Sequence, residues 1–169
     1  MAWYFANSAC HSACESGGTT PVILLNQTDV ADDPGSFQVA AEAVAPGVDV
    51  RAFVTDMGTV YAAADLLICR AGATTIAELA AQGVPAIFVP YPHAADDHQR
   101  ANAEALVRGG AARLVRDHQA TGARLAEEVR DVVGTPGLLA EMRQRVRQFA
   151  RPDAANRVLA VIDALVAGK

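Results

Sequence analysis

The chain has 169 residues, enough for one domain that buries its own core without disulfides or metal. Apolar residues make up 51% of it, aromatic residues only 5%, and the formal net charge is −5. This acidic balance excludes the domain-wide basic field that a nucleic-acid-binding domain uses to hold a phosphate backbone. No apolar run reaches the roughly 18 residues of a membrane-spanning helix. We therefore expect a cytoplasmic protein with no nucleic acid among its partners.

The first 21 residues are small and polar and show no hydrophobic period, so we expect an irregular N-terminal arm over residues 1–21. The arm lacks the basic start and long apolar stretch of a signal peptide. It holds Cys10, His11 and Cys14, which are metal-ligand types. A structural zinc site needs four ligands, and no second Cys/His pair follows at ligand spacing. We expect neither a metal site nor a disulfide framework.

After residue 21, short apolar runs alternate with segments of helical pattern. The expected strands are residues 22–25, 48–53, 66–69, 86–89 and 112–115, and the expected helices are residues 36–45, 57–64, 75–82, 97–108, 121–133, 136–150 and 152–166. Strands and helices that alternate at this spacing form right-handed crossovers and a parallel sheet. The sequence thus predicts one α/β, Rossmann-like domain over residues 22–169. Its last helix carries an apolar stripe, including Val158 and Ile162, so we expect it to pack as an amphipathic helix.

Residues 66–83 are the first candidate for a ligand site, because a buried strand is followed there by a turn of small residues and a helix. The first N–H groups of a helix lack internal partners and favour an anion such as a diphosphate. Glu78, one turn into the helix, suits a ribose diol. Thr75 and Glu78 also have the spacing of a capping box, which needs no ligand. From the residues alone both interpretations stay open.

The loop and helix start at residues 88–102 are the second candidate. The segment is dense in His, Asp, Gln and Asn, which a buried loop would not carry. Gln99 and Asn102 are one helical turn apart and offer donors and acceptors suited to sugar hydroxyls. His93, Asp96 and His98 are metal-ligand types, but no fourth ligand of matching spacing accompanies them, so we predict no metal here.

Three segments in order closely resemble the C-terminal domain of the MurG family: Cys-Arg-Ala-Gly-Ala-Thr-Thr-Ile-Ala-Glu-Leu at residues 69–79, Gly-Val-Pro-Ala-Ile-Phe-Val-Pro at 83–90, and residues 93–102. The resemblance runs from about residue 22 to the C-terminus. The family transfers GlcNAc from UDP-N-acetylglucosamine (UDP-GlcNAc) to a lipid-linked muramyl-pentapeptide, which turns lipid I into lipid II in peptidoglycan synthesis. It has the two-domain GT-B fold. The resemblance implies that this chain is the UDP-GlcNAc-binding half of such a hexosyltransferase, with no cofactor.

The resemblance also implies roles for single residues. It places the turn that meets the donor diphosphate at Gly72, Ala73, Thr74 and Thr75. Glu78 matches the carboxylate that holds the ribose hydroxyls, and Val54 matches a residue whose backbone reads the uracil ring. Gln99 matches a glutamine that binds the GlcNAc hydroxyls. His98 stands where many relatives carry a second glutamine, and Asn102 matches a motif residue with a structural role.

Two parts of the family pattern have no counterpart in the sequence. The family's C-terminal domain opens with a strand and a Gly-Gly-Ser turn, of which Gly17-Gly18-Thr19 is only a faint echo, so we expect the first strand to be missing. The N-terminal domain, which binds the lipid-linked acceptor and the membrane and supplies the general base, is also absent. The resemblance therefore implies no catalytic residue in this chain and no activity for the chain alone.

Two alternatives accompany this interpretation. The first alternative is that the chain resembles the donor-binding subunit of a split UDP-GlcNAc transferase, which acts only with a partner chain that holds the acceptor. A UDP-GlcNAc 2-epimerase shares the fold but needs catalytic carboxylates and a histidine spread over two domains. For either transferase, the acceptor-binding half implies a location at the inner face of the cell membrane. The sequence leaves open whether a second copy of the chain covers its exposed surface.

Overall fold

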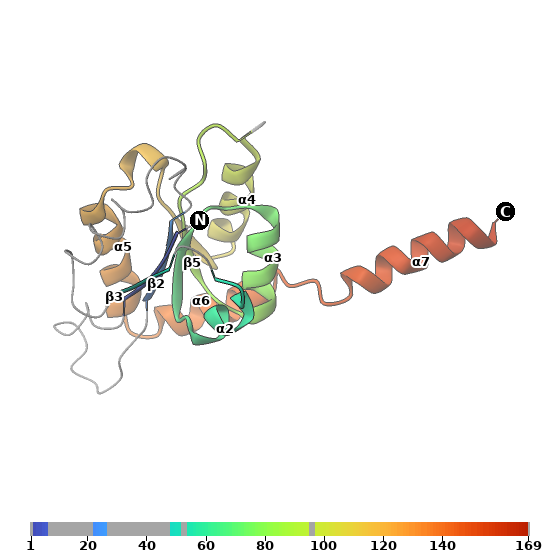
Figure 1. Cartoon of the computed structure of the whole chain (residues 1–169), viewed down its shortest axis with the longest axis horizontal. Coiled ribbons are helices and arrows are strands. Elements are labelled where there is room, and N and C mark those ends of the chain that lie inside the picture. Colours follow the sequence, from blue (N-terminus) through green and yellow to red (C-terminus); the bar gives the residue numbers. More distant parts are fainter. Residues whose placement is uncertain (1, 7–21, 27–47, 52–53, 95–96, 169) are drawn as a thin grey trace.

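A six-stranded sheet organises the molecule. The computed structural model describes residues 2–6, 22–26, 48–51, 54–94 and 97–168, with side chains described from residue 54 onward. The strand order is β3-β1-β2-β4-β5-β6. The strands are β1 (Ala2–Ala6), β2 (Val22–Asn26), β3 (Val48–Arg51), β4 (Leu66–Cys69), β5 (Ala86–Phe88) and β6 (Ala112–Leu114). Helices flank this sheet (Figure 1).

Strands β2, β4, β5 and β6 run parallel, which confirms the α/β class predicted from the alternation of strands and helices. Strand β1 is antiparallel to both of its neighbours, β2 and β3. The prediction of an irregular arm is therefore wrong over Ala2–Ala6, where a strand forms. Because β1 is antiparallel and lies between β3 and β2, it is not the first strand of the family pattern that we expected to be missing. The run Ala-Trp-Tyr-Phe-Ala has high β propensity, but the polar residues that follow it dominated the sequence pattern.

The helices begin and end close to the positions that the sequence predicts. They are α2 (Met57–Ala63), α3 (Ala73–Gln82), α4 (His98–Arg108), α5 (Gly122–Gly134), α6 (Leu138–Arg147) and α7 (Ala154–Ala167), with a short 3-10 turn, η2 (Asp117–Gln119), after β6. The helix expected at residues 36–45 lies outside the described residues, as do Cys10, His11 and Cys14.

Two apolar clusters hold the helices on opposite faces of the sheet. Because successive residues of a strand point to opposite faces, β4 contributes Leu67 and Cys69 to one cluster and Leu66 and Ile68 to the other. The first cluster includes residues of α2, α3 and α4, and the second joins the sheet to α5 and α6. The best-buried large side chains of these clusters are Phe88, Leu66, Leu67, Leu79, Ile87, Met142, Val132 and Val146. The parallel strands therefore end at a carboxyl edge whose position is fixed from both faces.

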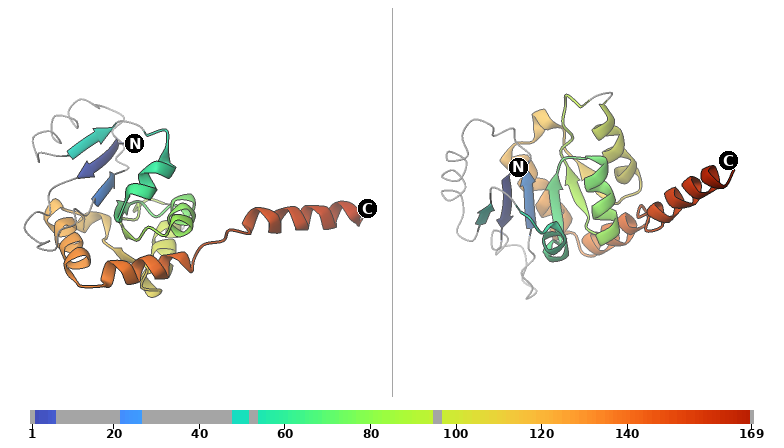
Figure 2. Two further views of the ribbon diagram at one scale, coloured as in Figure 1. Left: turned by 90° about the horizontal axis from the view of Figure 1, so that it is seen from below. Right: turned by 45° about the vertical axis from the view of Figure 1, so that its right-hand side comes forward.

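Helix α7 departs from the packing that its apolar stripe predicts. It leaves the body of the molecule in Figure 1 and in both views of Figure 2. None of its residues is buried, and Leu165 and Val166 are each 69% exposed. The prediction that this helix is amphipathic holds, but the expectation that it packs is wrong for the described part of the chain, because none of its residues is buried against the body.

Helix α3 ends at Gly83, as the sequence predicts. Gly83 lies in the left-handed region with φ 74° and ψ 34°, and its N–H donates to the carbonyls of Leu79 and Ala80. A Cβ at this position would lie 2.3 Å from Nε of Arg147, the far end of a flexible side chain. The backbone conformation, more than the contact, therefore requires glycine here.

Replacing Gly83 by alanine should lower the free energy of unfolding by about 1–2 kcal/mol, because a side chain in the left-handed region costs that much. Urea unfolding followed by circular dichroism measures the change. Gly134→Ala is the matched control: Gly134 ends α5, has no positive φ, and a Cβ there meets no atom within 4 Å. Equal destabilisation by the two substitutions would contradict the assignment.

Candidate functional site

The turn after β4 presents free backbone N–H groups at the carboxyl edge of the sheet. Gly72 is the N-cap of α3 with extended backbone, and no side chain caps the helix. The first bond of the helix runs from the N–H of Ile76 to the carbonyl of Gly72 at 3.0 Å. The N–H groups of Ala73, Thr74 and Thr75 therefore precede the helical ladder, where an anion is favoured.

The capping box considered for Thr75 and Glu78 does not form. Helix α3 begins at Ala73, two residues before Thr75, so Thr75 is already inside the first turn. A Cβ at Gly72 would meet only Oγ1 of Thr75, at 3.7 Å, so the turn leaves open space beside the backbone. The structure therefore does not support a capping box as the role of Thr75 and Glu78.

Glu78 is held instead by a tyrosine of another helix. The hydroxyl of Tyr61 on α2 donates a hydrogen bond to Oε2 of Glu78 at 2.8 Å. Tyr61 is 5% exposed, and its burial, with the hydrogen bond to Glu78, raises the pKa of its hydroxyl well above the ordinary value of 10.0. The hydroxyl thus stays a donor at neutral pH. Among the described residues no hydrogen bond engages Oε1 of Glu78, so this oxygen keeps its acceptor capacity.

Val54 lies just before α2 and is half-buried against the first apolar cluster. Helix α2 follows it with Asp56 as N-cap, and Oδ1 of Asp56 accepts from the N–H of Thr59 at 3.1 Å. Since α2 also carries Tyr61, the segment that holds Val54 and the helix that holds Glu78 meet through one contact between α2 and α3.

Two side chains of α4 make hydrogen bonds, one within the second predicted segment and one to the first. Oε1 of Gln99 accepts from the N–H of Tyr91 at 3.0 Å, in the loop that precedes α4. Nδ2 of Asn102 donates to the carbonyl of Ala71 at 3.4 Å, which ties α4 to the turn after β4. His98 is the first residue of α4 and is exposed.

Arg70 is a central residue of this edge that sequence reasoning did not single out. It is the last residue before the turn, its side chain is 17% exposed, and it forms an ion pair with Asp117 at 2.5 Å. The only feature of the sequence that could have identified Arg70 is its position between a buried strand and a turn of small residues. Tyr61 carried no signal in the sequence, because its partner is 17 residues away.

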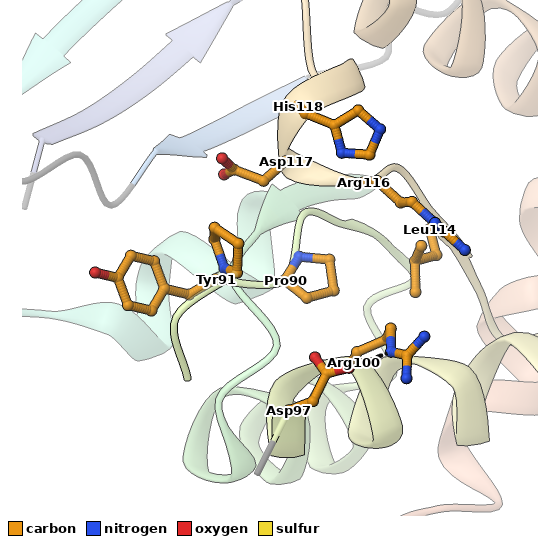
Figure 3. Close-up of a pocket in the computed structure, with 9 residues that line it drawn as sticks. Pro90, Tyr91, Asp97, Arg100, Leu114, Arg116, Asp117 and His118 are labelled. Atoms are coloured by element: carbon orange, nitrogen blue, oxygen red, sulfur yellow. Dashed lines mark ion pairs between the residues drawn. The ribbon is translucent and has the colours of Figure 1, made fainter. Parts of the chain in front are cut away.

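A pocket of about 260 Å³ opens beside this site, between the loop after β5 and the end of β6 (Figure 3). It is lined by Pro90, Tyr91, Pro92, Asp97, Arg100, Leu114, Arg116, Asp117 and His118. None of the predicted site residues lines it. Its charges are largely paired, since Asp97 binds Arg100 and Asp117 binds Arg70, each at 2.5 Å.

Metal and thiol chemistry find no support in the part of the chain that the structure describes. No group of three His, Cys, Asp or Glu side chains there could hold a metal ion. Cys69 is buried, and burial raises the pKa of its thiol, which keeps it protonated and unreactive. No helix among the described residues is long and apolar enough to cross a membrane.

Comparison with known proteins places this geometry among glycosyltransferases. The model of the glycosyltransferase family 28 C-terminal domain matches residues 9–158. The chain is 47% identical over 146 residues to the UDP-N-acetylglucosamine–N-acetylmuramyl-(pentapeptide) pyrophosphoryl-undecaprenol N-acetylglucosamine transferase of Solibacter usitatus, covering 85% of this chain and 38% of that protein. It is 49% identical over 113 residues to the protein of the same name from Geobacter sp. (strain M21), covering 67% and 30%.

Among solved structures, the chain is similar to Acinetobacter baumannii MurG, with a TM-score of 0.60 and 41% sequence identity. The match covers 66% of this chain and 33% of that one. The chain therefore spans about a third of the length of the relatives that it matches.

Replacing Tyr61 by phenylalanine should lower the free energy of unfolding by about 1 kcal/mol at neutral pH, because a partly buried hydrogen bond is lost. It should also change the response to alkali. The pKa of Tyr61 is raised in the folded state, so the wild-type fold is fully stabilised below about pH 10 and loses stability as pH rises above that value. Urea unfolding between about pH 8 and 11 should show a steeper decline for wild type than for Tyr61→Phe. Parallel curves would contradict the assignment.

Proposed function

The chain belongs to the glycosyltransferase family 28 C-terminal domain family, and on that premise we propose that it is the donor-binding domain of a transferase that moves GlcNAc from UDP-GlcNAc to a lipid-linked muramyl-pentapeptide. The observation that carries the proposal is the uncapped start of α3 beside Glu78. Three N–H groups and an oriented carboxylate within one helical turn suit a diphosphate joined to a ribose.

Each part of the donor has a group to receive it. The diphosphate binds the N–H groups of Ala73, Thr74 and Thr75, where Gly72 leaves room for the phosphate oxygens. The ribose hydroxyls donate to Glu78, whose Oε2 is already fixed by Tyr61. A residue that is positioned before binding loses less conformational freedom when the ligand arrives, which raises affinity.

The two ends of the donor meet other elements. The uracil ring binds to the backbone of Val54, ahead of α2, and the sugar hydroxyls bind to the amide of Gln99, with His98 beside it. Asn102 acts indirectly, because its amide holds α4 to the carbonyl of Ala71. This arrangement follows the carboxyl edge of the sheet, where ligands of parallel α/β domains bind.

The domain contributes to transfer by stabilising the leaving group. Negative charge grows on the UDP diphosphate as the glycosidic bond breaks, and the N–H groups and dipole of α3 stabilise that charge without rearrangement. The acceptor hydroxyl attacks from the opposite face, so the transfer inverts the anomeric centre. The acceptor site and the general base belong to the part of the relatives that this chain does not span.

The same donor site would also serve a second arrangement, in which this chain is a donor-binding subunit that acts with a partner chain. In both arrangements the lipid-linked acceptor brings the complex to the inner face of the cell membrane. Adding the acceptor-binding domain of a relative as a separate chain distinguishes them. Restored GlcNAc transfer supports a subunit that works in trans, whereas transfer only in a covalent fusion supports a single two-domain enzyme.

Calorimetric titration with UDP-GlcNAc and with UDP tests the proposed donor site. Replacing Glu78 by glutamine should weaken both ligands about 10- to 100-fold, because both contain the ribose and lose a charge-assisted hydrogen bond. Glu141→Gln is the matched control, since Glu141 is an exposed carboxylate of α6 paired with Arg145. No heat with either ligand at millimolar concentration, with the fold intact, would overturn the proposal.

Replacing Gln99 by alanine should separate the two ligands. The affinity for UDP-GlcNAc should fall about 3- to 10-fold, the value of one neutral hydrogen bond, while the affinity for UDP stays within about twofold. Gln144→Ala, on the exposed surface of α6, controls for loss of a helical glutamine. Equal weakening of UDP and UDP-GlcNAc would show that Gln99 does not contact the sugar.

A further inference from the structure

One guanidinium group joins the ends of three parallel strands. Arg70 follows β4, and its Nη1 donates to the carbonyl oxygens of Val89 at 3.0 Å and Pro90 at 3.3 Å, directly after β5. The same nitrogen donates to Oδ1 of Asp117 at 2.5 Å, in the turn after β6. The loops that leave β4, β5 and β6 are therefore held by a single side chain.

Asp117 is the charged acceptor among these three. It opens the turn η2, and its side chain is 37% exposed, whereas that of Arg70 is 17% exposed. In Figure 3, Asp117 and Tyr91 extend toward the same side of the pocket. Hydrogen bonds between ionised partners are shorter and stronger than those to neutral carbonyls. The ion pair with Asp117 therefore fixes the orientation of the Arg70 side chain. That orientation in turn allows the hydrogen bonds from Arg70 to the carbonyl oxygens of Val89 and Pro90.

The loop held by Arg70 is the one that orients Gln99. The guanidinium carbon of Arg70 lies 5.6 Å from the ring centre of Tyr91, within the range of a cation–π contact. The N–H of Tyr91 in turn donates to Oε1 of Gln99 at 3.0 Å. Contacts therefore run without a gap from Asp117 through Arg70 and Tyr91 to Gln99, although Asp117 lies in η2 and Gln99 lies in α4.

We propose that Asp117 is a positioning residue for the sugar end of the donor site: by fixing Arg70 it fixes the backbone of residues 89–91, and with it the direction of the Gln99 amide. This inference rests on the proposed function. Asp117 lines the neighbouring pocket and lies outside the set of groups assigned to diphosphate, ribose and uracil. Its loss should therefore change recognition of the sugar and leave recognition of UDP unchanged.

Titration of Asp117→Asn with UDP-GlcNAc and with UDP tests this. The substitution keeps the shape of the side chain and removes its charge. The affinity for UDP-GlcNAc should fall about 3- to 10-fold and that for UDP by less than about twofold, so the ratio of the two dissociation constants changes. Asp131→Asn is the matched control, because Asp131 forms an exposed ion pair with Arg113 at 2.7 Å, on α5. It should leave the ratio unchanged.

Amide hydrogen exchange of Tyr91 in the unliganded protein is an independent measurement. Its N–H should exchange several-fold faster in Asp117→Asn than in wild type or Asp131→Asn, because the loop no longer holds this N–H in hydrogen-bonding distance of Oε1 of Gln99. In an Arg70→Met background, Asp117→Asn should change neither the exchange rate nor the affinity ratio further, since its effect passes through Arg70.

The outcomes separate this inference from the donor site itself. If wild type binds UDP-GlcNAc and Asp117→Asn alters neither the affinity ratio nor the exchange of Tyr91, the positioning role is wrong and the donor site stands. Equal weakening of UDP and UDP-GlcNAc also overturns it, because that result indicates general damage to the edge of the sheet. If wild type binds neither ligand, the proposed function fails, and the sugar-positioning role fails with it.

Discussion

The parallel pairing of β4 with β5 is the constraint on which the site depends. Cys69 lies opposite Phe88 in this ladder, so both strands end at the same level of the sheet. The chain then leaves β4 as a turn of small residues and leaves β5 as a polar loop. Two segments about 20 residues apart in sequence thereby become neighbours. Parallel strands place their carboxyl ends at the same edge of the sheet, whereas the two strands of a hairpin end at opposite edges.

Side chains then fasten these neighbours in both directions. Arg70, from the β4 side, donates to the carbonyl of Val89, and Asn102, from the β5 side, donates to the carbonyl of Ala71. Each hydrogen bond satisfies a loop carbonyl group that takes no part in the hydrogen bonding of a strand or helix. The same two bonds also hold the turn after β4 and the loop after β5 at a fixed distance from one another.

The sequence predicted the elements better than the contacts between them. Apolar runs located β4, β5 and β6, and Gly83 located the end of α3, because these signals are local. The start of α3 was harder: Gly72 caps it without a side chain, so the Thr75–Glu78 pattern suggested a later start and a capping box. Strand β1 was missed because five residues of β propensity precede a long polar stretch.

Pairs distant in sequence could not be predicted. Glu78 accepts from Tyr61 across 17 residues, and Arg70 pairs with Asp117 across 47, distances that only the strand order closes. The family resemblance supplied candidate roles for Glu78 and Gln99, but it gave no reason for their orientation. That reason lies in Tyr61, Tyr91 and Arg70, which the structure adds.

Helix α7 has a consequence of a different kind. It is 14 residues long and buries none of them, while the described residues of its apolar stripe are 48–69% exposed. A helix of this length is marginal in water when nothing packs against it. Its stability therefore comes from the backbone hydrogen bonds and helix propensities of its own residues, without a contribution from burial against the sheet. The body of the domain and its last helix are thus stabilised by different interactions, the body by its buried apolar core and the helix by its own backbone.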